Sequence, residues 1–130
     1  MNVLIDSSAY IAWMREERDL PALLRPWVLR GECFMNGLIR AEVLRGVRRE
    51  RQRERMAEIF DVLNEAPMNS AFWRRVSMLA WNLDRAGVVL PLPDLAIAQT
   101  ALDCECTVIT LDNHFTQIPK LNILRDLPPV

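Results

Sequence analysis

Short apolar runs alternate with longer amphipathic segments along the whole chain. Apolar runs of strand length occupy residues 3–5, 33–35, 107–111 and 121–124. Between them, apolar residues recur at the helical period in residues 9–14, 21–31, 38–47, 48–63, 71–85 and 95–102. Short, continuously apolar strands separated by amphipathic helices are typical of parallel β-α units. The pattern therefore predicts an α/β fold with a central parallel β-sheet flanked by helices on both faces.

Several residues mark where these helices should begin and which way they should face. Ser7 and Ser8 follow the first apolar run, so we expect them to cap the first helix. The helix of residues 71–85 carries one apolar stripe that we expect to face the core, formed by Trp73, Val76, Ala80 and Leu83. The four tryptophans also supply enough aromatic surface for a homodimer contact, although we expect most of them in the core.

Length and composition fit a single domain that spans residues 1–130. The chain has 130 residues, of which 51% are hydrophobic, enough to bury a core without disulfides. The three cysteines are odd in number and lack the spacing of a zinc site, which favours a reducing, cytoplasmic environment. The sequence shows neither a signal peptide nor an apolar run long enough to span a membrane, so we expect no membrane association.

The charge balance argues against binding of nucleic acid through bulk positive charge. Sixteen basic and 17 acidic residues give a net charge of −1, so any contacts to phosphates must be local. All basic residues except Lys120 are arginine, the side chain suited to bidentate phosphate contacts. The arginine-rich segment 48–55 also contains Glu50 and Glu54, and we expect it to form an exposed, salt-bridged start of a helix.

Three aspartates occupy positions where a parallel sheet binds ligands. Asp6 ends the first apolar run and Asp112 follows the last clear one, and ligands bind beyond the carboxyl ends of such strands. Asp94 stands at the start of the helix of residues 95–102, where unpaired amide groups favour a carboxylate. Helix capping is therefore an alternative role for Asp94 taken alone.

We expect Glu42 to fall between Leu38, Ile39 and Gly46 on its predicted helix, inside an apolar arc that continues through Val43. A carboxylate that faces inward must pair with a cation, become protonated or bind a metal ion. Arg45, three residues further along, offers a salt bridge as the alternative to a metal.

If the four carboxylates converge, their repulsion calls for a hard divalent cation. Oxygen ligands without a neighbouring histidine or cysteine point to Mg²⁺ or Mn²⁺, and such sites hydrolyse phosphodiesters. The single histidine, His114, is expected to be a loop residue and not a ligand. No glycine-rich phosphate loop and no GxSxG elbow is present, and Ser8 stands where a dehalogenase-type phosphotransferase needs a second aspartate.

Four segments together resemble the PIN-domain ribonucleases, in particular the VapC-type toxins of toxin–antitoxin pairs: residues 3–8, 39–46, 93–98 and 110–115. The resemblance spans essentially the whole chain and implies that metal-binding acids fall on Asp6, Glu42, Asp94 and Asp112. It also implies that Ser8 and Thr110 support these acids. One departure is Asn36, which stands where the family often has serine or threonine at the entry to its second motif.

The resemblance implies a function as well as a fold. It implies cleavage of RNA that depends on Mg²⁺ or Mn²⁺, frequent homodimers, and a cognate antitoxin that covers the acidic groove. A weaker hypothesis from the residues themselves is that Arg40 and Arg45 position phosphates beside the acids. Two alternatives stay open at this point: a non-catalytic interaction module with the same fold, and a structure-specific DNA nuclease with the same metal chemistry.

Overall fold

The computed structural model describes residues 1–129 and contains a single parallel β-sheet. Its strands are β1 (Asn2–Ile5), β2 (Cys33–Met35), β3 (Asn64–Glu65), β4 (Cys106–Ile109) and β5 (Ile123–Leu124). They lie in the order β3-β2-β1-β4-β5, and every neighbouring pair is parallel. The predicted α/β fold with a central parallel sheet is confirmed.

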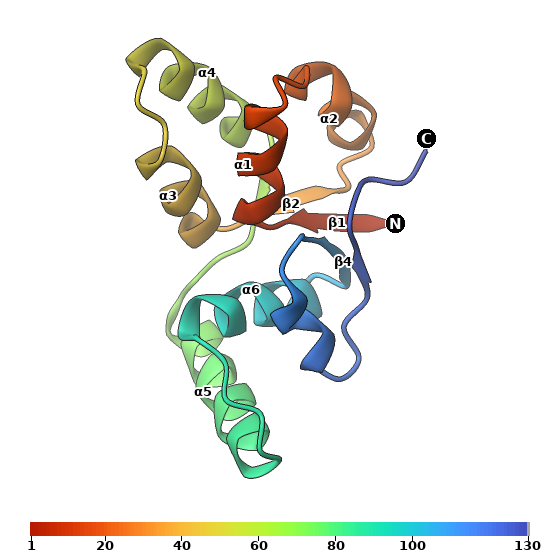
Figure 1. Cartoon of the computed structure of the whole chain (residues 1–130). Coiled ribbons are helices and arrows are strands. Elements are labelled where there is room, and N and C mark those ends of the chain that lie inside the picture. The colour runs from red at the N-terminus through yellow and green to blue at the C-terminus, as the bar shows by residue number, and fades with distance from the viewer. Residues whose placement is uncertain (130) are drawn as a thin grey trace.

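Helices cover both faces of this sheet, as the sequence predicted (Figure 1). One layer contains α1 (Ser7–Arg15), α2 (Leu20–Leu29), α3 (Gly37–Arg45) and α4 (Glu50–Asp61). The opposite layer contains α5 (Ser70–Arg85) and α6 (Leu92–Asp103), and a short 3-10 helix, η1 (Asn113–Gln117), connects β4 to β5. None of the helices in residues 1–129 is long and apolar enough to cross a membrane.

The strand order reverses direction at β1, and this reversal creates a switch point between β1 and β4. The chain first adds β2 and β3 on one side of β1, then returns to add β4 and β5 on the other side. Right-handed crossovers in opposite directions place their helices on opposite faces, so α3 and α6 diverge around the carboxyl ends of β1 and β4. Ligands of open α/β sheets bind at such a switch point.

The two strands that border the switch point are buried except for Asn2, the half-buried first residue of β1. Val3, Leu4 and Ile5 of β1 are each 0% exposed, as are Val108 and Ile109 of β4. Strands that are covered on both faces need continuous apolar sequence, which explains why the two runs lack a polar alternation. Asp6 and Asp112 therefore follow the two most completely buried strands of the sheet.

A buried asparagine fastens α3 to α6 near that point. The Asn36 side chain is 0% exposed; its Oδ1 accepts a hydrogen bond from the Ile39 amide at 2.9 Å and thereby caps α3. Its Nδ2 donates to Oγ1 of Thr100 in α6, also at 2.9 Å. Asn36, the departure from the family pattern, thus performs both the capping and the cross-linking at the start of α3.

Several details differ from the sequence prediction. Ser7 and Ser8 are not caps: Asp6 occupies the N-cap position of α1, and both serines lie inside the helix. The strand predicted for residues 107–111 is β4, and it ends at Ile109. The side chain of the next residue, Thr110, donates a hydrogen bond to Asp6. Strand β3 was not predicted, since its two residues are polar and exposed at the sheet edge.

The surface also differs from the prediction in two places. Trp73 is 44% exposed although its stripe was expected to face the core, because only Phe72, Val76 and Leu83 of α5 are buried. Of the four tryptophans, Trp13 and Trp27 belong to the core and the other two are exposed. Segment 48–55 is exposed as expected, but none of its arginines forms a salt bridge within residues 1–129.

Substitution of Asn36 tests how much the link between α3 and α6 stabilises the fold. Asn36→Ala should lower the free energy of unfolding by about 2–3 kcal/mol, because it removes a helix cap and leaves a buried partner unpaired. Asn69→Ala is the matched control, since Asn69 caps α5 in the same way from an exposed position and should cost only about 1 kcal/mol. Urea unfolding measures both; equal losses would show that the bond to Thr100 contributes nothing.

Candidate metal centre

Asp6 is held rigidly at the carboxyl end of β1. Its amide donates to the carbonyl of Ile109 at 2.9 Å, which continues the pairing of β1 with β4 by one residue. Its carboxylate is only 4% exposed, and Oδ2 accepts hydrogen bonds from Ser8 Oγ at 2.8 Å and from Thr110 Oγ1 at 2.9 Å. A buried carboxylate is stabilised by such donors, and here they also fix its orientation.

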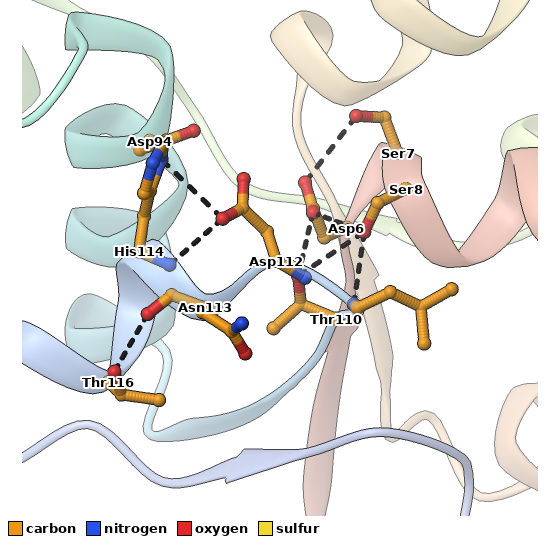
Figure 2. Close-up of polar contacts among 10 residues, drawn as sticks. Asp6, Ser7, Ser8, Asp94, Thr110, Asp112, Asn113, His114 and Thr116 are labelled. Carbon is orange, nitrogen blue, oxygen red and sulfur yellow. Dashed lines mark hydrogen bonds and ion pairs between the residues drawn. The ribbon is translucent and has the colours of Figure 1, made fainter.

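Thr110 connects Asp6 to Asp112. While its hydroxyl donates to Asp6, the same oxygen accepts the amide of Asp112 at 3.0 Å. Ser8 works similarly, because its oxygen accepts the amide of Leu111 at 3.1 Å. The loop after β4 is thus anchored on the two hydroxyls that hold Asp6, which brings Asp112 beside it (Figure 2).

Glu42 approaches from α3 and is half-buried. Its Oε1 accepts a weak hydrogen bond from Ser7 Oγ at 3.4 Å. Burial raises the pKa of Glu42, and the negative charge of Asp6 raises it further. The salt bridge to Arg45 that the sequence left open does not form within the described part of the chain, because Arg45 points into solvent.

Asp94 lies in the first turn of α6, with a side chain that is 16% exposed. Burial raises its pKa, and the charges of Asp112 and Asp6 add to this effect, while a hydrogen bond from His114 opposes it. The capping role that the sequence left open is not observed: the N-cap of α6 is Pro91, and the Asp94 carboxylate contacts His114 instead. Its charge still lies near the positive end of the helix.

His114, which the sequence led us to expect as a loop residue and not a ligand, lies beside these acids. It lies on η1, where Asp112 Oδ1 accepts the His114 amide at 2.8 Å, and its Nδ1 is 2.7 Å from Asp94 Oδ2 (Figure 2). The hydrogen bond to Asp94 raises the pKa of His114, and the charge of Asp112 raises it further. Ligand atoms of Asp94, Asp112 and His114 all lie within 4.8 Å of one another.

The composition of the site fits a divalent cation. Burial raises the pKa values of Glu42 and Asp94, and the neighbouring carboxylates raise them further. Within residues 1–129 no arginine or lysine pairs with Asp6, Glu42, Asp94 or Asp112; hydroxyls and one exposed imidazole are their side-chain partners. Carboxylate oxygens of this kind suit Mg²⁺ and Mn²⁺, and a single imidazole is compatible with Mn²⁺.

The two arginines suggested for phosphate contacts occupy different environments. Arg40 Nη2 pairs with Asp61 Oδ1 of α4 at 2.9 Å, and its guanidinium lies over the Phe60 ring, 5.6 Å from the centroid. This arginine therefore joins α3 to α4. Arg45 is exposed, makes no salt bridge among the described residues and lies close enough to Glu42 to influence its pKa.

Comparisons with known proteins agree with this fold. Residues 3–121 match the PIN domain family. Among solved structures, VapBC from Salmonella typhimurium bound to DNA gives a TM-score of 0.78 at 15% identity, covering 95% of this chain and 97% of the other. VapBC2 from Rickettsia felis bound to a promoter DNA fragment gives 0.76 at 19% identity, covering 95% and 98%. A toxin-antitoxin complex from Klebsiella pneumoniae gives 0.72 at 21% identity, covering 95% and 96%.

No curated protein shows significant similarity to the sequence. The identities to the solved structures are low, so these structures establish the fold and not the activity. The family match, in contrast, covers most of the chain, including both strands of the switch point and all four carboxylates that converge there. The chain is therefore a member of the PIN domain family.

Proposed function

We propose that the protein is a metal-dependent endoribonuclease that hydrolyses RNA phosphodiester bonds and acts as the toxin of a type II toxin–antitoxin pair. The observation that carries this proposal is the convergence of Asp6, Glu42, Asp94 and Asp112 at the switch point without a lysine or arginine partner in the described residues. Structural proteins seldom maintain such uncompensated charge, because it destabilises the fold. Membership of the PIN domain family supports the same chemistry.

Each residue has a definite part in this proposal. Bound Mg²⁺ or Mn²⁺ would supply Lewis acidity and lower the pKa of a water molecule. Asp6, Glu42, Asp94 and Asp112 would hold the metal directly or through water. Ser8 and Thr110 keep Asp6 in one orientation, and His114 positions the Asp94 carboxylate by the contact to its Oδ2. Preorganised ligands of this kind keep their geometry during the reaction.

The competing functions differ from this proposal in one respect each. The raised pKa values of Glu42 and Asp94 mean that ionisation of these groups destabilises the fold. A non-catalytic interaction module would gain nothing from carboxylates at these positions. A DNA nuclease would share the entire metal site, and RNA is preferred here because of the resemblance to the VapC-type toxins. Digestion of RNA and DNA side by side distinguishes the two substrates.

An antitoxin partner is supported by a groove away from the metal centre. It has a volume of about 720 Å³ and lies between the end of α1, α2 and α4. Its floor is apolar, with Leu20, Leu24 and Met56, and its rim carries Arg55 and Glu58. Such a groove fits an amphipathic segment of a partner protein. The similar structures from Salmonella typhimurium and Rickettsia felis are VapBC complexes, which favours an antitoxin as that partner.

Removal of one carboxylate tests the metal site. Asp94→Asn should abolish detectable Mn²⁺ binding by calorimetry and slow RNA cleavage by more than about 100-fold, because it removes a charge that is needed for the cation. Asp6→Asn should behave alike, while Glu54→Gln, an exposed acid on α4, should leave both unchanged. Circular dichroism verifies that the variants fold. Cleavage that persists in both aspartate variants would refute the proposal.

The raised pKa of Glu42 predicts a stability change that metal reverses. A carboxyl group with a raised folded-state pKa contributes stability below its unfolded pKa, and that contribution is lost as pH rises through the folded value. At pH 7 without metal, Glu42→Gln should therefore unfold at the same or a higher temperature than the wild type, and this advantage should vanish near pH 4. Mn²⁺ should raise the melting temperature of the wild type more than that of Glu42→Gln, because the variant lacks one carboxylate that would hold the ion. If Glu42→Gln is less stable than the wild type at pH 7 without metal, then charge repulsion at Glu42 does not destabilise the fold.

Arg45 is expected to contact an RNA phosphate. In an Asp94→Asn background with EDTA, Arg45→Gln should weaken binding of single-stranded RNA and reduce the slope of log K against log salt by about 0.7, the value for one phosphate contact. Arg125→Gln is the control, since Arg125 is exposed and near β5. Fluorescence anisotropy at several salt concentrations gives both slopes. Equal slopes for wild type and Arg45→Gln would exclude the contact.

A further inference from the structure

The arginine-rich segment 48–55 carries positive charge that the fold does not neutralise. All five of its arginines are exposed, and none forms a salt bridge within residues 1–129: Arg48, Arg49, Arg51, Arg53 and Arg55. The sequence favoured a salt-bridged helix surface for this segment, and that structural role is not observed. The segment is therefore free to bind a partner of opposite charge.

Positive charge is concentrated in this segment and not spread along the chain. Residues 48–55 contain five arginines and two glutamates, which gives the segment a net charge of +3. The rest of the chain holds 11 of the 16 basic and 15 of the 17 acidic residues, a net charge of −4. A basic segment on an otherwise acidic protein is the electrostatic pattern of a local contact with nucleic acid.

The arginines lie where their charge opposes the helix that they begin. Helix α4 starts at Glu50, and Arg49 is its N-cap residue, whose side chain makes no capping hydrogen bond. The helix dipole disfavours cations at this end. Arg49 and Arg53 are four residues apart, as are Arg51 and Arg55, and like charges repel at this spacing on a helix. A bound polyanion would relieve both costs.

The segment follows directly after the helix that carries one of the four acids. Helix α3, which bears Glu42, contacts α4, and a short loop of residues 46–49 joins the two at one corner of the molecule (Figure 1). Arg45, the last residue of α3, is exposed and lies between Glu42 and this loop along the chain. A strand of nucleic acid that leaves the metal centre along α3 therefore reaches the start of α4 next.

We propose that segment 48–55 binds the phosphate backbone of single-stranded RNA that extends from the metal centre past Arg45. The inference rests on the proposed ribonuclease function and adds a second place of contact with the substrate. Guanidinium groups pair with phosphate oxygens in a bidentate manner, and positively charged surfaces of proteins follow the backbone of a single strand. Contacts of this kind hold the RNA in place without reading its bases.

An acidic protein segment fits this surface less well than RNA does. The apolar groove that we assign to a protein partner is lined by only one of the five arginines, Arg55, and its rim also carries Glu58. The other four arginines lie outside the groove. Their surface has one sign of charge and no apolar centre, whereas protein interfaces combine an apolar centre with a polar rim.

The salt dependence of RNA binding tests the proposal. In an Asp94→Asn background with EDTA, Arg49→Gln together with Arg53→Gln should weaken binding of single-stranded RNA and reduce the slope of log K against log salt by about 1.4, the value for two phosphate contacts. The matched control is Arg74→Gln together with Arg125→Gln, two exposed arginines without a salt bridge in the described residues. Fluorescence anisotropy gives the slopes. An unchanged slope, or an equal decrease in the control, would overturn the proposal.

Thermal unfolding and a second polyanion distinguish RNA binding from other roles. The double variant of Arg49 and Arg53 should melt at the same or a higher temperature than its parent, because it loses like-charge repulsion. A lower melting temperature would show that these arginines support the fold instead. Poly-glutamate should displace RNA poorly, because its carboxylates lie on flexible side chains that binding must order. Equally effective displacement would assign the segment to an acidic protein and overturn the proposal.

Cleavage kinetics separate the failure of this proposal from the failure of the nuclease function. With all four acids intact, the double variant of Arg49 and Arg53 should raise KM for RNA and leave kcat unchanged, because it removes binding at a distance from the reacting phosphate. A lowered kcat at constant KM would overturn the proposal. If the wild type does not cleave RNA but the salt slope still falls in the double variant, the RNA contact stands and the nuclease function fails.

Discussion

The repulsion among four carboxylates at the carboxyl ends of β1 and β4 is the constraint around which this structure is organised. Burial and mutual charge raise the pKa of Glu42 and of Asp94, so the site is destabilising whenever these groups are ionised without a cation. The apolar residues buried in β1 and β4 stabilise the sheet enough to tolerate this cost. A site that costs stability in its metal-free form gains it when a cation binds.

Rigid support gives the site its geometry. Thr110 and Ser8 hold Asp6 and also anchor the loop that carries Asp112, so one pair of hydroxyls positions two acids from different strands. Asn36 caps α3 and binds Thr100 of α6, which couples the helices that carry the other two acids. Asp6 and Asp112 are thereby tied to the ends of β1 and β4, and Glu42 and Asp94 lie on helices that cover opposite faces of the sheet.

The apolar groove proposed for a protein partner does not include any of the four acids. The apolar groove belongs to α1, α2 and α4, whereas α5 and α6 form the opposite layer of helices (Figure 1). A partner segment in the groove would therefore leave the α5 and α6 layer uncovered. This separation follows from the reversal of strand order, which distributes the helices over the two faces.

The sequence by itself determined the parallel α/β fold and the strand-end acids, because burial on both faces leaves continuous apolar runs and the switch point follows their carboxyl ends. The inward orientation of Glu42 was predicted from its position within an apolar arc of its helix. Local pattern could not decide which side of α5 is covered, so Trp73 was assigned to the core. Nor could it show that His114 meets Asp94, since twenty residues separate them and only the fold makes them neighbours. Such pairings, like the role of Asn36 between two helices, depend on tertiary packing, which periodicity does not encode.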